Sequence, residues 1–410
     1  MHIWGMLTVL NPSAAEMCMT QNDSLAYWET EVSTHMPHLR RSFVRLLAWY
    51  SFGIVLTQSC GCTTVSVFLA QLLDMKENTL RQRLREWSYD APAKRGRLRQ
   101  ELDVRPCFPA LIRWILAAWP SDERRVVLVM DATTLRQTVT VLTISLVYRG
   151  CAIPVAWACV GAVTPGAWRP YWEQVLTTIA PSIPAEWTVL VMADRGLYAR
   201  WLFQHIQTCG WHPFLRINAQ GWVRIDDHAP WTALANQVPR PGTTWRGSVT
   251  CFKAMPLRCT LVGMWTADYA DPWLIVTDLP PALAEVAWYG MRTWIEQGFK
   301  RIKRGGWHWE QTKMTDPARI ARLWLVIAVA TLWVVRVGGE ADATLPASSL
   351  DALPSTHIAR RRTTAATRPR TVGCFRRGIL RILVALLRHE PLPHGRFIPV
   401  PWPEPHDTYP

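Results

Sequence analysis

Residues 126–131 read Val-Val-Leu-Val-Met-Asp, and residues 188–194 read Thr-Val-Leu-Val-Met-Ala-Asp. Each stretch is a short apolar run of the kind that forms a strand buried on both faces of a sheet. The first polar residue after each run is an aspartate, Asp131 or Asp194. If the two strands are neighbours, both carboxylates lie in the crevice where open α/β sheets bind ligands. The alternative is that each aspartate only begins a turn, but the repeated pattern favours a site.

The segments around these two strands predict an α/β protein with a mixed sheet. Strand-like runs at 139–148 and 152–160 follow the first buried strand, and helical patterns at 171–179 and 197–208 flank the second. A further strand is expected at 214–217. The order of three strands, helix, strand, helix and strand is typical of a mixed sheet with helices on its faces. Residues 218–280 contain short strand-like pieces between turn residues, which indicates a β-rich insertion.

A helix is predicted from 283 to 304, and one of its faces carries a third acid. At 100° per residue, a single arc of about 80° contains Tyr289, Arg292, Glu296, Lys300 and Lys303. A lone glutamate among basic residues is more often a salt-bridge partner than a ligand. The arc borders an apolar stripe, however, so Glu296 is expected at the edge of the core. The stripe consists of Trp288, Met291, Ile295, Phe299 and Ile302.

The spacing of Tyr289, Arg292, Glu296 and Lys303 resembles the signature of DDE transposases of the insertion sequence 4 family. In a chain of this composition the signature is expected by chance about 5 times in 10,000. Asp131 and Asp194 resemble the first two acidic motifs of that family, in the expected order. The β-rich segment before the glutamate is similar to the insertion that such enzymes carry. The resemblance covers roughly residues 120–340.

The resemblance implies a ribonuclease-H-like catalytic core with Asp131, Asp194 and Glu296 as catalytic residues and metal ligands. The implied activity is cleavage of insertion-sequence ends and their joining to target DNA. Carboxylate oxygens suit Mg²⁺ or Mn²⁺, and two such ions about 4 Å apart support in-line phosphoryl transfer. The implied partners are double-stranded transposon-end DNA, target DNA and a second copy of the chain in a homodimer.

The same resemblance implies which residues hold DNA phosphates. They are Tyr289, Arg292 and Lys303 of the signature, with Lys300 and Arg195 as further DNA-binding residues. Well-studied relatives have Trp directly after the signature arginine, where it holds a flipped base during hairpin formation. Here that position is Thr293, and Trp294 is expected to point away from the acidic residues. Four tryptophans of the insertion could stack on a base, although packing of the insertion is the favoured interpretation: Trp222, Trp231, Trp245 and Trp265.

The chain has 410 residues and a formal charge of +14, which favours a polyanion such as nucleic acid or a membrane surface as partner. Residues 1–120 are expected to form a helical DNA-binding module whose third helix, 77–87, carries three arginines. A solvated helix face is the alternative for that helix. Residues 341–410 form a basic C-terminal region with an Arg-rich, helical tail. Between 357 and 388 it has nine arginines and no acid: Arg360, Arg361, Arg362, Arg368, Arg370, Arg376, Arg377, Arg381 and Arg388.

Nothing in the sequence suggests secretion or a membrane span. The ten cysteines have no zinc-ligand spacing and are interpreted as reduced thiols. The longest apolar stretch, 323–335, is shorter than the roughly 20 residues that a spanning helix needs, so it is predicted to be a core helix. A cytoplasmic protein associated with the bacterial nucleoid is expected.

Two other functions remain open at this point. One is another ribonuclease-H-like DNA nuclease, which needs neither the Arg and Lys arrangement nor the insertion. The other is a catalytically inactive DNA-binding protein derived from a transposase, which the presence of all three acids disfavours.

Overall fold

The computed structural model describes residues 21–95, 99–163, 168–267, 269–344 and 372–403. The chain folds as a mixed α/β structure around one ten-stranded sheet, with helices before and after it. The N-terminal helices are α1 (Gln21–His35), α2 (Arg41–Thr57), α3 (Cys62–Leu72), α4 (Glu77–Trp87) and α5 (Cys107–Ala117). Five arginines of the predicted tail, at 360, 361, 362, 368 and 370, lie outside the described residues.

The first half of the sheet contains the predicted strands and their crossover helices. These are β1 (Arg125–Leu135), β2 (Val139–Tyr148), β3 (Cys151–Gly161), α6 (Arg169–Ile179), β4 (Thr188–Ala193), α7 (Arg200–Thr208) and β5 (His212–Arg216). The strands lie in the order β3-β2-β1-β4-β5, with β1, β2 and β3 antiparallel and β1, β4 and β5 parallel. This is the strand order of a ribonuclease-H-like core.

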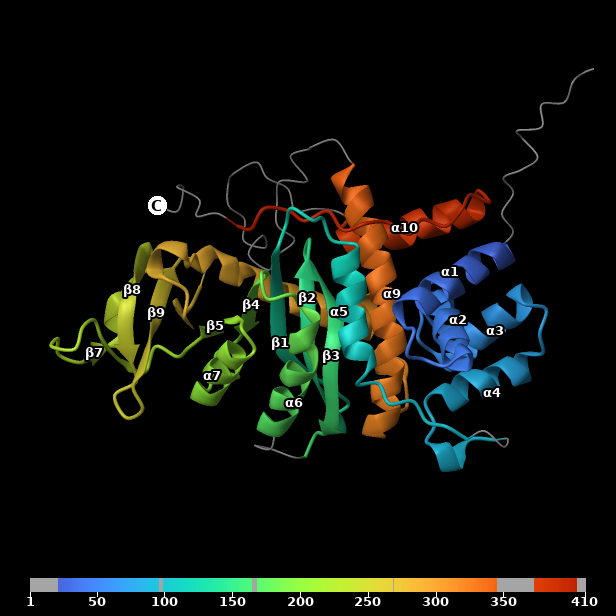
Figure 1. The fold of residues 1–410 in the computed structure, drawn as a ribbon, viewed down its shortest axis with the longest axis horizontal. Coiled ribbons are helices and arrows are strands. Elements are labelled where there is room, and N and C mark those ends of the chain that lie inside the picture. Colours follow the sequence, from blue (N-terminus) through green and yellow to red (C-terminus); the bar gives the residue numbers. More distant parts are fainter. Residues whose placement is uncertain (1–20, 96–98, 164–167, 268, 345–371, 404–410) are drawn as a thin grey trace, which may run out of the picture.

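The predicted insertion continues the same sheet. Its strands are β6 (Trp222–Arg224), β7 (Thr232–Ala233), β8 (Thr243–Cys251), β9 (Leu257–Trp265) and β10 (Trp273–Thr277). The fully buried β10 pairs antiparallel with β5, and β9, β8, β6 and β7 follow outward from it. In Figure 1, β8 and β9 therefore lie at the end of the molecule opposite the N-terminal helices. The β-rich character of the segment was predictable, but its pairing with β5 was not.

The apolar stretch 323–335 is the centre of the longest helix, α9 (Pro317–Ala343), as predicted for a core helix. Asp316 caps its start by accepting a hydrogen bond from the backbone N of Arg319 at 2.8 Å. Within the described ranges, α9 is the single helix long and apolar enough to span a membrane, and 94% of its most apolar 18-residue window is buried inside the protein. The pair α2 and α3 meets the same test only jointly, and the two helices meet at 101°.

Helix α9 joins the two parts of the molecule. It lies between β3 and the N-terminal helices, and the last helix, α10 (Cys374–Leu387), packs along it (Figure 1). The Trp87 indole of α4 donates to the Arg322 carbonyl of α9 at 2.8 Å. The buried Arg322 guanidinium in turn contacts Asp90 at 2.8 Å. One hydrophobic core thus runs from α1 to the C-terminal segment, and the predicted domain limits at 120 and 340 remain predictions.

The predicted helix at 283–304 is helical but not a single α-helix. Val286–Thr293 forms a 3-10 helix, α8 covers Trp294–Lys300, and Arg301–Gly305 is a π-helical turn. A 3-10 helix turns by about 120° per residue, so the arcs expected at 100° per residue shift. Tyr289 is consequently buried, whereas Trp288, expected in the core, is only partly buried.

Acidification is expected to destabilise the protein through His394, which lies after α10. Burial first, and then the nearby Arg336 guanidinium, lower the pKa of His394 to about 4. The unfolded chain binds a proton at this residue near pH 6.5, so folding stability falls between about pH 6.5 and 4. Urea unfolding at pH 7 and 5 measures this loss, and His394→Gln is expected to reduce it. An unchanged pH dependence in the variant would contradict the assignment.

Candidate active site

Asp131 and Asp194 lie level with one another on neighbouring strands. In the parallel pairing of β1 with β4, Val129 is opposite Met192, and each aspartate is two residues further along its chain. Asp194 follows β4 directly, and its Oδ1 accepts hydrogen bonds from the backbone N atoms of Gly196 and Leu197 at 3.0 and 3.1 Å. This turn orients the carboxylate and leaves Oδ2 for other partners.

Glu296 comes from α8, and the Arg292 side chain connects it to both aspartates. One guanidinium nitrogen, Nη2, lies 2.9 Å from Asp131 Oδ2 and 3.3 Å from Asp194 Oδ2. The other, Nη1, lies 2.5 Å from Glu296 Oε1, one helical turn away. The structure therefore brings all three sequence-predicted acids around one cation. The sequence placed Arg292 and Glu296 on one face but gave no sign that the guanidinium contacts the aspartates.

The electrostatics of the cluster follow from its partial burial. Burial raises the pKa of Asp131 to about 6, and the neighbouring Asp194 and Glu296 carboxylates add to the rise, while Arg292 opposes it. Burial by itself would lower the pKa of Arg292, but the surrounding carboxylates outweigh it and raise that pKa. Three carboxylates face one guanidinium, so the cluster has an excess of negative charge that favours added cations.

Tyr289 supports the site from within the core. Its hydroxyl donates to the carbonyl oxygen of Ala193 at 3.3 Å, directly before Asp194. Its ring packs edge-on against Trp273 of β10, with centroids 5.2 Å apart. The side chain is buried, so in this structure it fixes the distance between β4 and the Arg292 segment.

The other sequence-predicted DNA-binding residues lie on the helical segment that carries Glu296 or directly after Asp194. Lys300 is exposed on α8. Lys303 lines a cavity of about 440 Å³ together with Arg136, Arg304 and Glu310, and burial lowers its pKa. Arg195 is half-exposed and pairs with Asp271 at 3.1 Å.

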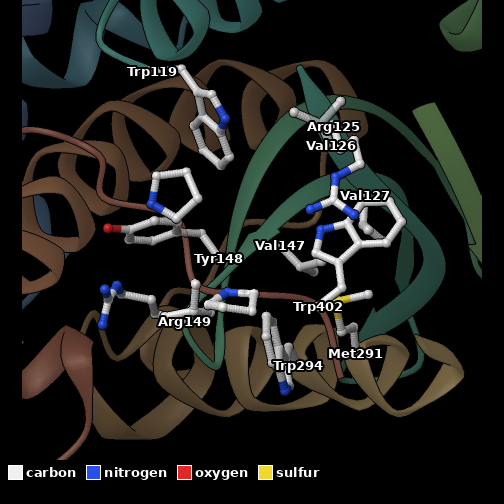
Figure 2. Close-up of a pocket in the computed structure, with 13 residues that line it drawn as sticks. Trp119, Arg125, Val126, Val127, Val147, Tyr148, Arg149, Met291, Trp294 and Trp402 are labelled. Carbon is white, nitrogen blue, oxygen red and sulfur yellow. The ribbon is translucent and has the colours of Figure 1, made fainter. Parts of the chain in front are cut away.

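Trp294 points away from the acids, as the sequence predicted. It is buried and lines a small cavity between the sheet and the C-terminal segment, on which Figure 2 is centred. In the same view Trp402 lies beside Arg125, whose guanidinium is 4.8 Å from the Trp402 ring centroid. Trp402 also packs edge-on against Trp288, with centroids 4.9 Å apart. This contact was not predictable from the sequence, and it joins the C-terminal segment to the 3-10 helix that precedes α8.

The carboxylate cluster has the chemistry of a divalent-metal site. Across the described parts of the chain, no group of three or more His, Cys, Asp and Glu side chains is arranged to hold a metal ion. The Arg292 guanidinium contacts all three acids. The three carboxylates nevertheless converge on a positive charge, and hard oxygen donors are the ligands that Mg²⁺ and Mn²⁺ prefer. The three carboxylates are thus donors of the kind that such ions bind.

Removing the Arg292 side chain is expected to destabilise the protein without added metal. Arg292→Ala removes the guanidinium that three partly buried carboxylates share, which costs about 2 kcal/mol of the free energy of unfolding. Arg195→Ala is the matched control, since its exposed pair with Asp271 contributes less than about 1 kcal/mol. Urea unfolding with and without Mg²⁺ measures both, and Mg²⁺ is expected to restore Arg292→Ala selectively. Equal effects of the two substitutions would contradict this account.

Comparisons with known proteins find a family similarity for part of the chain. Residues 167–333 match the family model described as "Transposase DDE domain". No curated protein matches the chain. Among solved structures, a piggyBac transposase synaptic complex with hairpin DNA is similar at 12% identity and a TM-score of 0.37, covering 79% of this chain and 74% of that one. Residues 167–333 of this chain, which include Asp194, Arg292 and Glu296 but not Asp131, are thus similar to a transposase DDE domain.

Proposed function

We propose that this protein is a DNA transposase of the insertion sequence 4 family, which cleaves the ends of its own element and joins them to target DNA. The observation that carries the proposal is the cluster of Asp131, Asp194 and Glu296 around one guanidinium. Two of these acids lie in the region that is similar to a transposase DDE domain. The signature spacing of Tyr289, Arg292, Glu296 and Lys303 supports the finer family assignment.

The three carboxylates would hold two Mg²⁺ or Mn²⁺ ions. When bound, such ions supply Lewis-acid stabilisation of the attacking and leaving oxygens of phosphoryl transfer. The chain's own contribution is to hold Asp131 and Asp194 level on a rigid sheet and to bring Glu296 toward them from α8. The turn at Gly196 and Leu197 fixes the Asp194 carboxylate, which reduces the reorganisation that metal binding requires.

The basic residues around the acids would bind DNA phosphates. Arg292 has a forked guanidinium whose geometry suits a phosphate. With metal ions bound to the carboxylates, this guanidinium would bind a DNA phosphate instead of the three acids. Lys300 and Lys303 lie further along the same helical segment, and Arg195 lies beyond Asp194. For Tyr289, the buried hydroxyl supports a positioning role beside Ala193 more than direct phosphate contact.

The remaining elements of the proposal concern assembly and location. Paired transposon ends call for two active sites, so the protein is proposed to act as a homodimer on DNA. The net charge of +14 suits a cytoplasmic protein associated with the bacterial nucleoid. A simple nuclease is the second candidate function, because the same acid cluster would also support hydrolysis of DNA.

Strand cleavage on DNA that carries the candidate terminal repeats tests the proposal. The protein is incubated with this DNA and Mg²⁺, and cleavage and strand joining are followed on denaturing gels. Cleavage at the repeat ends with joining to target DNA is the expected result. Cleavage without end preference or joining would favour the nuclease. DNA binding without any metal-dependent cleavage would favour an inactive derivative and overturn the proposal.

A further inference from the structure

A second basic surface lies on the far side of α9 from the acids. A cavity of about 550 Å³ opens between α3, α4 and the residues that lead into α9. Its basic residues come from two distant parts of the chain: Arg81 and Arg85 from α4, Lys313 from the segment before α9, and Arg319 from the first turn of α9. We call this surface the α4–α9 groove. Figure 1 shows α4 and α9 on the side of the molecule away from β8 and β9.

The charge balance of the groove is strongly positive. The residues that line it include four cations and one carboxylate, that of Asp316. The Asp316 carboxylate already accepts the capping hydrogen bond at the start of α9, so it serves the helix. Arg85 and Lys313 are exposed, and neither makes an ion pair with another described residue. The groove therefore presents positive charge that the described part of the protein does not neutralise.

Arg319 is held in place but incompletely satisfied. Its guanidinium carbon lies 4.7 Å from the centroid of the Tyr89 ring, which orients the group. Its Nε atom is buried and has no hydrogen-bond partner within the described protein. Buried N–H donors are nearly always paired in folded proteins, so this one is suited to an acceptor that the described residues do not supply.

The arrangement on α4 is selective. Arg81 and Arg85 are one helical turn apart and face the groove, whereas Arg83, between them, is exposed and does not line it. The sequence alone treated the three arginines alike. The structure separates them and adds Lys313 and Arg319, which lie more than 200 residues away in the chain.

We propose that the α4–α9 groove binds backbone phosphates of double-stranded DNA. This inference rests on the proposed function, because it assigns a second DNA contact to a protein that cleaves DNA. Open, exposed cations spread along a groove suit a polyanion, which exchanges condensed counterions for Arg and Lys. Since α4 and the start of α9 both contribute, DNA bound here would engage the N-terminal helices and the helix that packs against the sheet together.

Salt-dependent DNA binding by the full-length chain tests the groove. Fluorescence anisotropy with a labelled random-sequence duplex is measured in EDTA over about 50 to 300 mM KCl, so that no cleavage contributes. Arg85→Ala and Lys313→Ala are expected each to weaken binding about 3- to 10-fold and to reduce the slope of log K against log salt by about 0.9. Arg83→Ala, the matched control, is expected to leave both values unchanged.

Other outcomes separate this inference from its alternatives. If Arg83→Ala weakens binding as much as Arg85→Ala, or if neither groove substitution has an effect, the groove is not the DNA contact. A second outcome would reassign the groove to a small phosphate ligand. In that case inorganic phosphate, at constant ionic strength, competes with a labelled nucleotide for the groove, and the groove substitutions leave DNA affinity unchanged. If the wild-type protein binds DNA through the groove but cleaves none in Mg²⁺, the proposed transposase activity is overturned. The assignment of the groove as a DNA-binding site would still stand.

Discussion

Asp194→Asn is expected to reduce metal-dependent DNA cleavage by about 10³-fold or more, with little change in folding. The substitution removes the negative charge that a metal ion needs. It retains an Oδ1 atom that can accept both hydrogen bonds from the backbone N atoms of Gly196 and Leu197. The turn after β4 should therefore survive, and the loss should appear in the cleavage rate under saturating DNA.

The matched control for this prediction is Asp271→Asn. Asp271 is an exposed carboxylate that pairs with Arg195, the residue next to Asp194, and it does not contact the acid cluster. Cleavage by this variant should stay within about threefold of wild type. If Asp194→Asn retained more than about a tenth of the wild-type rate, Asp194 would not be a metal ligand in the reaction.

Gly378→Ala is expected to destabilise the protein by about 3 kcal/mol. A Cβ atom at Gly378 on α10 would overlap with the backbone carbonyl of Val334 on α9. Gly338 on α9 faces the Cys374 carbonyl in the same way, so the two helices touch backbone to backbone. Neither backbone can move aside without separating α10 from α9, which is buried over most of its length.

Gly373→Ala provides the control for the helix contact. Among the described residues, a Cβ atom at Gly373 meets only the flexible end of the Arg301 side chain, at 3.4 Å. Urea unfolding should show a change within about 1 kcal/mol for this variant. Similar unfolding midpoints for Gly378→Ala and wild type would mean that the two helices do not pack as closely as the structure shows.

The sequence predicted the parts of the molecule that local patterns determine. The buried runs before Asp131 and Asp194 form β1 and β4 as expected, and the observed register, with Val129 opposite Met192, brings the two aspartates level. The apolar stretch within α9 is buried as expected. These features depend on hydrophobicity along a short segment, which a sequence displays directly.

Long-range contacts were not predictable in the same way. The pairing of β10 with β5 joins the insertion to the first half of the sheet. It depends on which edge strand of that sheet the end of the insertion pairs with, and no local sequence pattern specifies this. Tyr289, in the 3-10 helix, packs against Trp273 of β10, a contact that its local sequence does not display. The contact of Arg292 with Asp131 joins residues 161 positions apart, and nothing in either local sequence encodes it.

The most direct test of the acid cluster as a metal-dependent DNA-cleaving site is anomalous diffraction from crystals of the protein with end DNA and Mn²⁺. We expect anomalous peaks about 4 Å apart between Asp131, Asp194 and Glu296, with the Arg292 guanidinium moved from the carboxylates toward a DNA phosphate. The absence of peaks there, with Arg292 still bound to all three acids in the presence of DNA and saturating Mn²⁺, would contradict the account.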